Sequence, residues 1–141
     1  AIFKTKISKR GFDHLVEADS CGTANYHVGD KPDHRTIANA KKNGVTIDHF
    51  GKQLSVKHLD EYDLILAMDH SNHLNILRLD KAEKNVNKIF LMRSFDQDRD
   101  LDEVPDPYYG DESDFQKVFE ILDRSTDLFI KFLEKEHLKL K

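Results

Sequence analysis

The chain is poor in cysteine and has no long apolar stretch, and both absences limit what it can be. Its only cysteine is Cys21, so no disulfide can form within the chain, which fits a reducing, cytoplasmic setting. The longest run of purely apolar residues, at positions 64–68, is far too short to cross a bilayer. Residues 1–6 lack the apolar core of a secretory signal. We therefore expect a cytoplasmic protein without a membrane partner.

The chain also lacks an excess of positive charge. It has 22 Lys and Arg against 26 Asp and Glu, a net charge of -4, which argues against nucleic acid or an anionic membrane as the main partner. Its 141 residues, 38% of them apolar, are enough for one hydrophobic core. Since no repeat, low-complexity segment or linker interrupts them, we expect residues 1–141 to form a single domain.

Apolar periodicity alternates between the patterns of helices and strands. Short apolar runs predict strands at 14–20, 62–68 and 88–92. Helical spacing predicts helices at 1–10, 32–43, 55–61, 71–79 and from 115 to 133, with Pro32 near one start, Gly44 as a stop and Ser55 as a cap. Strands that alternate with helices predict an α/β fold with a parallel sheet. Ligands of such sheets bind beyond the carboxyl ends of the strands.

The segment after the first expected strand holds the only cysteine. A cysteine loop that grips phosphate needs an arginine six positions after the cysteine, and His27 stands there instead. We therefore interpret Cys21 as a small residue that packs at the end of a strand rather than as a nucleophile.

The segment after the second expected strand begins at Asp69. Asp69 or Ser71 can cap the next helix, and the side chains of Asp69, Ser71 and Asn72 can also brace a neighbouring anion-binding loop. His70 and His73 invite a metal interpretation, but a third ligand is not nearby in sequence. We expect no metal site.

The loop after the third expected strand contains an acid between two prolines. Pro105 and Pro107 stiffen the backbone around Asp106, and Tyr108 and Tyr109 follow. A carboxyl group held beside aromatic rings loses hydration, which would raise its pKa and suit it to general acid catalysis. An ordinary Asp-Pro turn whose tyrosines pack on the last helix is the structural alternative. Spacing alone supports both interpretations equally.

Five segments in matching order resemble the low-molecular-weight protein tyrosine phosphatases over nearly the whole chain. They are D-S-C-G-T at 19–23, where the family usually has D-S-A-G-T, H-V-G-D-K-P-D-H-R at 27–35, G-V-T-I-D-H at 44–49, D-E-Y-D-L-I-L-A-M-D-H-S-N at 60–72 and V-P-D-P-Y-Y-G-D-E-S-D-F at 104–115. The resemblance implies a three-layer sandwich whose parallel sheet has four strands. It implies hydrolysis of a phosphotyrosine protein or a small aryl phosphate without a cofactor.

The resemblance also implies roles for single residues. Asp106 matches the general acid. Tyr26 and Tyr108 match aromatic walls of the substrate cleft, with His27 and Tyr109 beside them. Five more residues match those that hold the family's phosphate loop in shape: Ser20, His49, Asp69, Ser71 and Asn72.

The sequence departs from the family at its start. The family opens with a central strand and a C-x5-R loop, and then a helix that residues 1–10 match, so we expect an N-terminally truncated chain that is inactive alone. A missing central strand would leave sheet edges open for self-association. A non-catalytic binding or regulatory protein is the alternative. An arsenate reductase fits less well, because that activity requires further cysteines.

Overall fold

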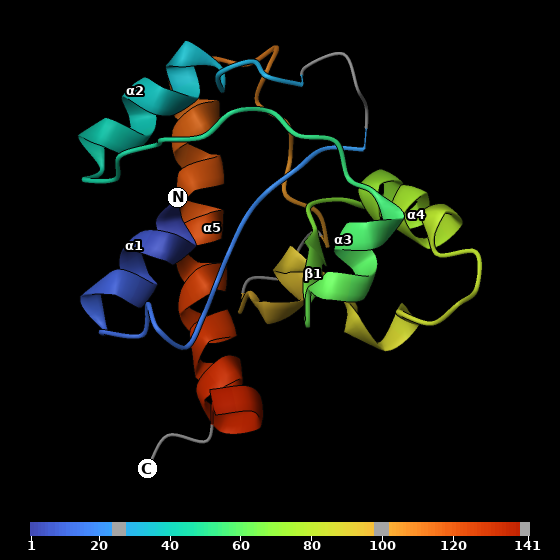
Figure 1. The fold of residues 1–141 in the computed structure, drawn as a ribbon. Coiled ribbons are helices and arrows are strands. Elements are labelled where there is room, and N and C mark those ends of the chain that lie inside the picture. Colours follow the sequence, from blue (N-terminus) through green and yellow to red (C-terminus); the bar gives the residue numbers. More distant parts are fainter. Residues whose placement is uncertain (24–27, 98–101, 139–141) are drawn as a thin grey trace.

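Two short parallel strands form the centre of the computed structural model, which describes residues 1–23, 28–97 and 102–138 (Figure 1). The strands are β1 (Ile65–Ala67) and β2 (Ile89–Leu91), and their register pairs Ile65 with Ile89 and Ala67 with Leu91. Parallel neighbours need a crossover connection, and α4 (His70–Leu79) supplies it. The parallel sheet of the expected α/β fold is therefore present.

Helices before and after the strands complete the fold. They are α1 (Ile2–Lys9), α2 (His34–Lys42), α3 (Val56–Glu61) and α5 (Glu112–Leu133), with the 3-10 turns η1 (Val86–Lys88) and η2 (Met92–Phe95) and the π-helical segment η3 (Glu134–Leu138). Each expected helix is present, with its ends set by local chemistry. Ser55 and His58 form a capping box at α3, and Gly44 follows α2 with a φ of 81°. Within the described residues no helix is both long and apolar enough to cross a membrane.

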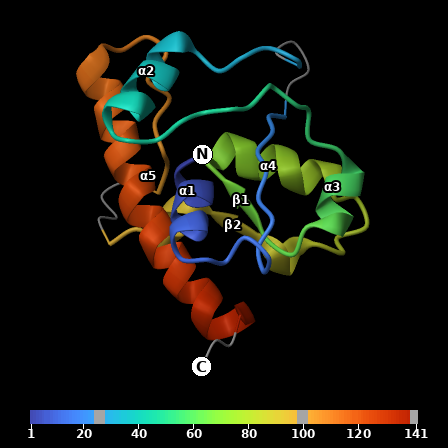
Figure 2. The same cartoon turned by 60° about the vertical axis from the view of Figure 1, so that its left-hand side comes forward.

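Side chains of β1 alternate between two apolar clusters, one on each face of the sheet. Ala67 packs with Leu59 of α3 and Ile76 of α4 on one face. Leu66 packs on the other face with Phe3 of α1 and with α5, whose contributions include Phe129 and Leu133. Figure 2 shows the strands between α5 and the α3–α4 side of the molecule. Helices thus cover both faces, which is the layered arrangement predicted from the sequence.

The strand expected at 14–20 is absent, so that prediction is wrong. Residues 12–15 form a turn, in which Leu15 N donates to Phe12 O at 2.9 Å, and residues 16–21 run outside any ladder. Only Gly22, just beyond the segment, forms an isolated parallel bridge, with Gln53. A strand is defined by its ladder partner, and none lies beside residues 14–20 in the described part of the chain.

Candidate active site

The loop that carries Asp106 starts at the carboxyl end of β1. Val104 N donates to Met68 O at 2.7 Å, one residue beyond the strand. Glu103 is held twice, because its carbonyl accepts from Arg93 Nη1 at 3.0 Å and its carboxylate accepts from His70 N at 2.8 Å. Val104 itself is buried in the cluster under α5. These contacts fix the start of the loop where ligands of parallel sheets bind.

Asp106 lies at the exposed part of this loop. Its Oδ1 accepts a hydrogen bond from Tyr108 N at 3.0 Å, so the carboxylate closes an Asx turn. The Tyr108 and Tyr109 rings meet edge to face with centroids 4.9 Å apart, and they are 56% and 98% exposed. The carboxyl group of Asp106 is exposed as well, rather than desolvated as expected from the neighbouring rings. Acid and rings are therefore open to an incoming ligand.

A hollow of about 140 Å³ separates this loop from α5. Pro105, Asp106 and Tyr109 line one side, and Lys117 and Val118 of α5 line the other. Gly110 closes the loop against α5, since a Cβ at this position would lie 2.8 Å from the Cβ and Cγ of Asp114. The glycine therefore allows the close approach of the loop to the first turn of α5.

Ser20 and His49 form a second polar group. Ser20 Oγ and His49 Nε2 lie 3.0 Å apart, and His49 Nδ1 lies 3.8 Å from Asp19 Oδ1. Lys52 Nζ donates to Asp19 Oδ2 at 2.6 Å. Partial desolvation acts to raise the pKa of Asp19, but the hydrogen bonds from Lys52 and from Ser20 N outweigh it and lower the pKa. Asp19 therefore stays ionised beside the imidazole.

A groove of about 600 Å³ opens beside this group. Its lining comes from α1, from residues 13–19 and from residues 48–52, and it includes Asp19, His49 and Phe3. The wall carries both apolar side chains and carboxylates, so the groove combines packing surface with polar groups.

Asp69 caps α4, as the sequence allowed. Its side chain accepts from Asn72 N at 2.7 Å, and Ser71 and Asn72 form the first turn of the helix. The capped turn lies next to the Asp106 loop through the Met68–Val104 and His70–Glu103 hydrogen bonds. No hydrogen bond joins Asp69 to Ser20 or His49 in the described residues, so the predicted support residues form two groups rather than one.

Cys21 lies next to Ser20 but is a poor nucleophile. Partial desolvation of its sulfur and the nearby Asp19 carboxylate raise the pKa of the Cys21 thiol. A raised pKa leaves less of the reactive thiolate at neutral pH. The packing role at the end of a strand that the sequence predicted is wrong, however, because Cys21 is exposed and no strand precedes it in the described residues.

Two of the predicted substrate contacts, Tyr26 and His27, lie outside the described residues. Three residues that sequence reasoning missed contact the site. Arg93 holds Glu103, Arg35 donates to Tyr108 O at 2.9 Å, and Asn75 Nδ2 of α4 lies 3.5 Å from Thr23 Oγ1. Each arginine contacts the Asp106 loop through a backbone carbonyl, and a carbonyl leaves no signal in the sequence.

Comparison with known proteins places this geometry in a family. Residues 1–139 match the family model of low molecular weight phosphotyrosine protein phosphatase. The chain belongs to that family. Over 134 residues this phosphatase-family chain is 40% identical to the low molecular weight phosphotyrosine protein phosphatase of Saccharomyces cerevisiae, covering 93% of this chain and 83% of the relative. The resemblance inferred from the five segments is thus confirmed, and the family is one of protein-tyrosine-phosphatase enzymes.

Solved structures of phosphatases have the same fold. A protein tyrosine phosphatase from Entamoeba histolytica, with Hepes in its active site, superposes with a TM-score of 0.90 at 32% identity and covers 99% of this chain and 88% of that chain. YfkJ from Bacillus subtilis also gives a TM-score of 0.90, at 30% identity, with coverage of 97% and 85%. The α/β fold class predicted from the sequence is therefore confirmed.

Proposed function

We propose that the chain supplies the general acid and the supporting groups of a phosphotyrosine phosphatase site. The observation that carries this proposal is the Asp106 loop, which is anchored at the carboxyl end of β1 and presents an exposed carboxyl group beside two exposed tyrosine rings. A phosphotyrosine protein or a small aryl phosphate fits such a site, because the ester oxygen meets an acid and the ring meets aromatic surface.

Asp106 acts twice in this reaction. In the first step the P–O bond to the phenol breaks as a thiolate bonds to phosphorus, and the protonated carboxyl gives its proton to the leaving oxygen. In the second step the carboxylate accepts a proton from the water that attacks the phosphocysteine, which returns the thiolate and releases phosphate. The proton removed in one step is thus recovered in the other.

The remaining predicted residues have positioning or contact roles in this proposal. Tyr108 and Tyr109 contact the aromatic part of the substrate, and family resemblance assigns Tyr26 and His27 to the same cleft. Ser20, His49, Asp69, Ser71 and Asn72 hold the phosphate-binding loop. Two observations support this: Ser20 Oγ lies 3.0 Å from His49 Nε2, and the Asp69 side chain accepts from Asn72 N, so both groups have fixed polar side chains.

The nucleophile is not supplied by the residues of this sequence. Cys21 has His27 six positions later instead of arginine, and its pKa is raised. We therefore expect the 141 residues alone to be inactive. A non-catalytic binding protein is the alternative, but a binding module has no need of a proton donor, and the acid loop is intact. A single cysteine disfavours an arsenate reductase and favours a reducing, cytoplasmic location.

A fusion tests this proposal. The family's first strand and C-x5-R loop are placed before Ala1, and hydrolysis of p-nitrophenyl phosphate and of a phosphotyrosine peptide is measured at mildly acidic pH. We expect turnover from the fusion and none from the 141 residues alone. Asp106→Asn should lower turnover about 100-fold, the usual scale of general acid catalysis.

The matched control is Asp102→Asn, in the same loop. Asp102 is exposed and lies 3.6 Å from His70 Nε2, so its loss should leave turnover nearly unchanged. Turnover that survives Asp106→Asn, or that falls equally with Asp102→Asn, would refute the assignment of the acid.

A further inference from the structure

The middle of the acid loop has a single hydrogen bond to the rest of the described chain. Residues 105–110 contain two internal bonds, from Tyr108 N to Asp106 Oδ1 and from Gly110 N to Pro107 O. Among the described residues, the only hydrogen bond that reaches this segment from outside comes from Arg35 Nη2 to Tyr108 O, at 2.9 Å. The position of Asp106 therefore depends on Arg35 more than on any other polar contact.

Arg35 contacts the loop with more than this one hydrogen bond. Its guanidinium lies over the Phe115 ring, 4.7 Å from the centroid, and 5.5 Å from the centroid of Tyr108. It also forms two hydrogen bonds to Asp33, one from Nε at 3.2 Å and one at 2.8 Å from Nη2, the nitrogen that also donates to Tyr108 O. A planar guanidinium that is hydrogen-bonded to two partners and lies over an aromatic ring has little freedom to move.

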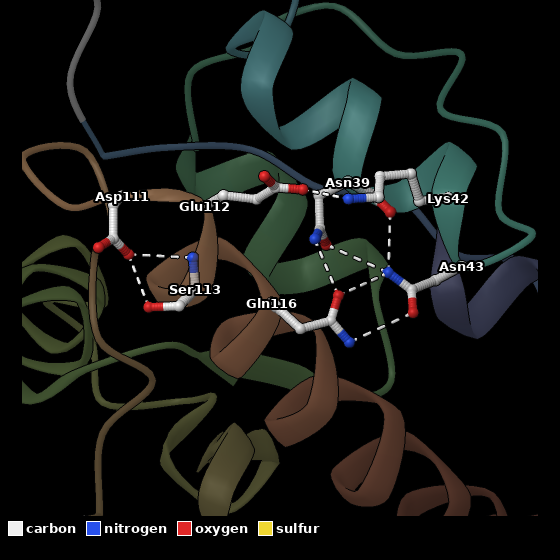
Figure 3. A network of polar contacts seen from close by, with 7 residues as sticks. All are labelled: Asn39, Lys42, Asn43, Asp111, Glu112, Ser113 and Gln116. Atoms are coloured by element: carbon white, nitrogen blue, oxygen red, sulfur yellow. Dashed lines mark hydrogen bonds and ion pairs between the residues drawn. The ribbon is translucent and has the colours of Figure 1, made fainter.

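Arg35 is also mounted on a fixed helix. Asp33 caps α2 by accepting from Arg35 N at 2.9 Å. Figure 3 shows how α2 is held to α5: Gln116 Oε1 accepts from Asn39 Nδ2 at 2.9 Å and from Asn43 Nδ2 at 2.8 Å. Lys42 also pairs with Glu112. Because α2 is fixed to the start of α5, Arg35 can transmit that rigidity to the loop.

We propose that Arg35 is a positioning residue that sets the place of the Asp106 carboxylate. It holds the carbonyl of Tyr108, and the N–H of the same residue holds Asp106, so the two hydrogen bonds form one chain from α2 to the acid. The two hydrogen bonds are observed in the structure, and their importance for catalysis rests on the proposed function of Asp106. Arg35 exerts its effect by geometry, because its own charge is balanced by Asp33.

Amide hydrogen exchange on the 141-residue chain tests the structural half of this proposal without any turnover. In Arg35→Ala, exchange at Tyr108 and Gly110 should rise about tenfold, as expected for the loss of one hydrogen bond to a charged group. Val104 should keep its protection, since Met68 O and not Arg35 holds it. Arg35→Lys keeps the charge but not the planar guanidinium, so its exchange rates at Tyr108 and Gly110 should lie between those of the wild type and those of Arg35→Ala.

His34→Ala is the matched control, because this neighbouring side chain is 93% exposed and contacts no acid-loop residue in the described structure. Exchange at Tyr108 and Gly110 in the His34→Ala variant should equal that of the wild type. Unchanged exchange at Tyr108 and Gly110 in Arg35→Ala, or an equal rise at Val104 and in α4, would overturn the proposal.

The fusion with the cysteine loop supplies a second readout. General acid catalysis matters more for a phenol that leaves poorly, so Arg35→Ala should lower turnover of phenyl phosphate more than that of p-nitrophenyl phosphate. An equal loss for both substrates would contradict a role in placing the acid. A fusion that never turns over refutes the proposed function instead, and leaves the exchange result to decide on Arg35.

Discussion

At the scale of single residues, the ion pair between Asp33 and Arg35 links acidity to the order of the acid loop. The side-chain hydrogen bonds from Arg35, then the backbone hydrogen bond from Arg35 N, lower the pKa of Asp33 from 3.8 to about 2. The folded pKa is thus below the ordinary value. The stabilising contribution of Asp33 is therefore fully present above about pH 4 and is lost as the pH falls toward 2.

Titration of the Asp33 carboxyl carbon by NMR checks this prediction. The midpoint should lie near 2 in the wild type and should move toward the ordinary value of 3.8 in Arg35→Ala, because the main cause of the shift is removed. His34→Ala should change the midpoint little, since the charge of His34 is the smallest of the causes. A wild-type midpoint close to 3.8 would show that the Asp33–Arg35 contact does not form in solution.

Sequence reasoning reached some of these residues and missed others for a physical reason. Asp106 was predicted because two prolines and two tyrosines mark its loop, and Ser20 and His49 because their order matches the family. Arg35 lies within a matched segment, yet its partner is a carbonyl 73 residues away. Backbone atoms are the same at every position, so such a contact becomes visible only in the structure.

At the scale of elements, the side-chain amides of Asn39, Asn43 and Gln116 form a cluster that holds α2 to α5 (Figure 3). The acid loop depends on this contact because α2 carries Arg35. Gln116→Ala removes the oxygen that accepts from Asn39 and Asn43. Asn39 is only 6% exposed, so its amide would lose its partner away from water. We expect the free energy of unfolding to fall by about 1–3 kcal/mol, measured by urea denaturation.

Two further variants make this measurement specific. Gln116→Glu keeps an accepting oxygen at the same place and should retain most of the stability. Lys117→Ala changes an exposed neighbour on α5 and should have an effect within about 0.5 kcal/mol. The role of the cluster would be refuted if Gln116→Ala were no more destabilising than Lys117→Ala.

Helices were easier to predict than strands because their signals are local. Asp69, Ser55 and Gly44 mark helix ends through contacts within a few residues, and α3, α4 and the end of α2 lie where these residues place them. The segment at 14–20 has the composition of a strand, but a strand also requires a neighbour. In the described residues that neighbour is missing, which local sequence cannot reveal.

At the scale of the whole molecule, the extended segment beside α1 has backbone groups available for pairing. The N–H groups of Glu17, Ala18 and Asp19 have no hydrogen-bond partner among the described residues, and the 600 Å³ groove lies beside them. Among the described residues, β1 pairs only with β2, so the other edge of each strand has no neighbouring strand. Free edges of this kind are sites for pairing with another chain.

We therefore expect the 141-residue chain to be marginally stable or to self-associate. If the chain self-associates, sedimentation velocity should show a mass that rises with protein concentration. If it is marginally stable, urea denaturation should give a free energy of unfolding below about 5 kcal/mol. Placing the family's first strand before Ala1 should relieve both effects. A monomer at every concentration that unfolds cooperatively with ordinary stability would contradict this expectation.

The most direct test of the central claim is the dependence of turnover on the leaving group. The fusion with the cysteine loop is given aryl phosphates whose phenols cover a range of pKa values, with and without Asp106→Asn. If Asp106 protonates the leaving oxygen, turnover of the parent should change little along the series, and turnover of Asp106→Asn should fall steeply as the phenol pKa rises. Two parallel lines would show that Asp106 is not the general acid.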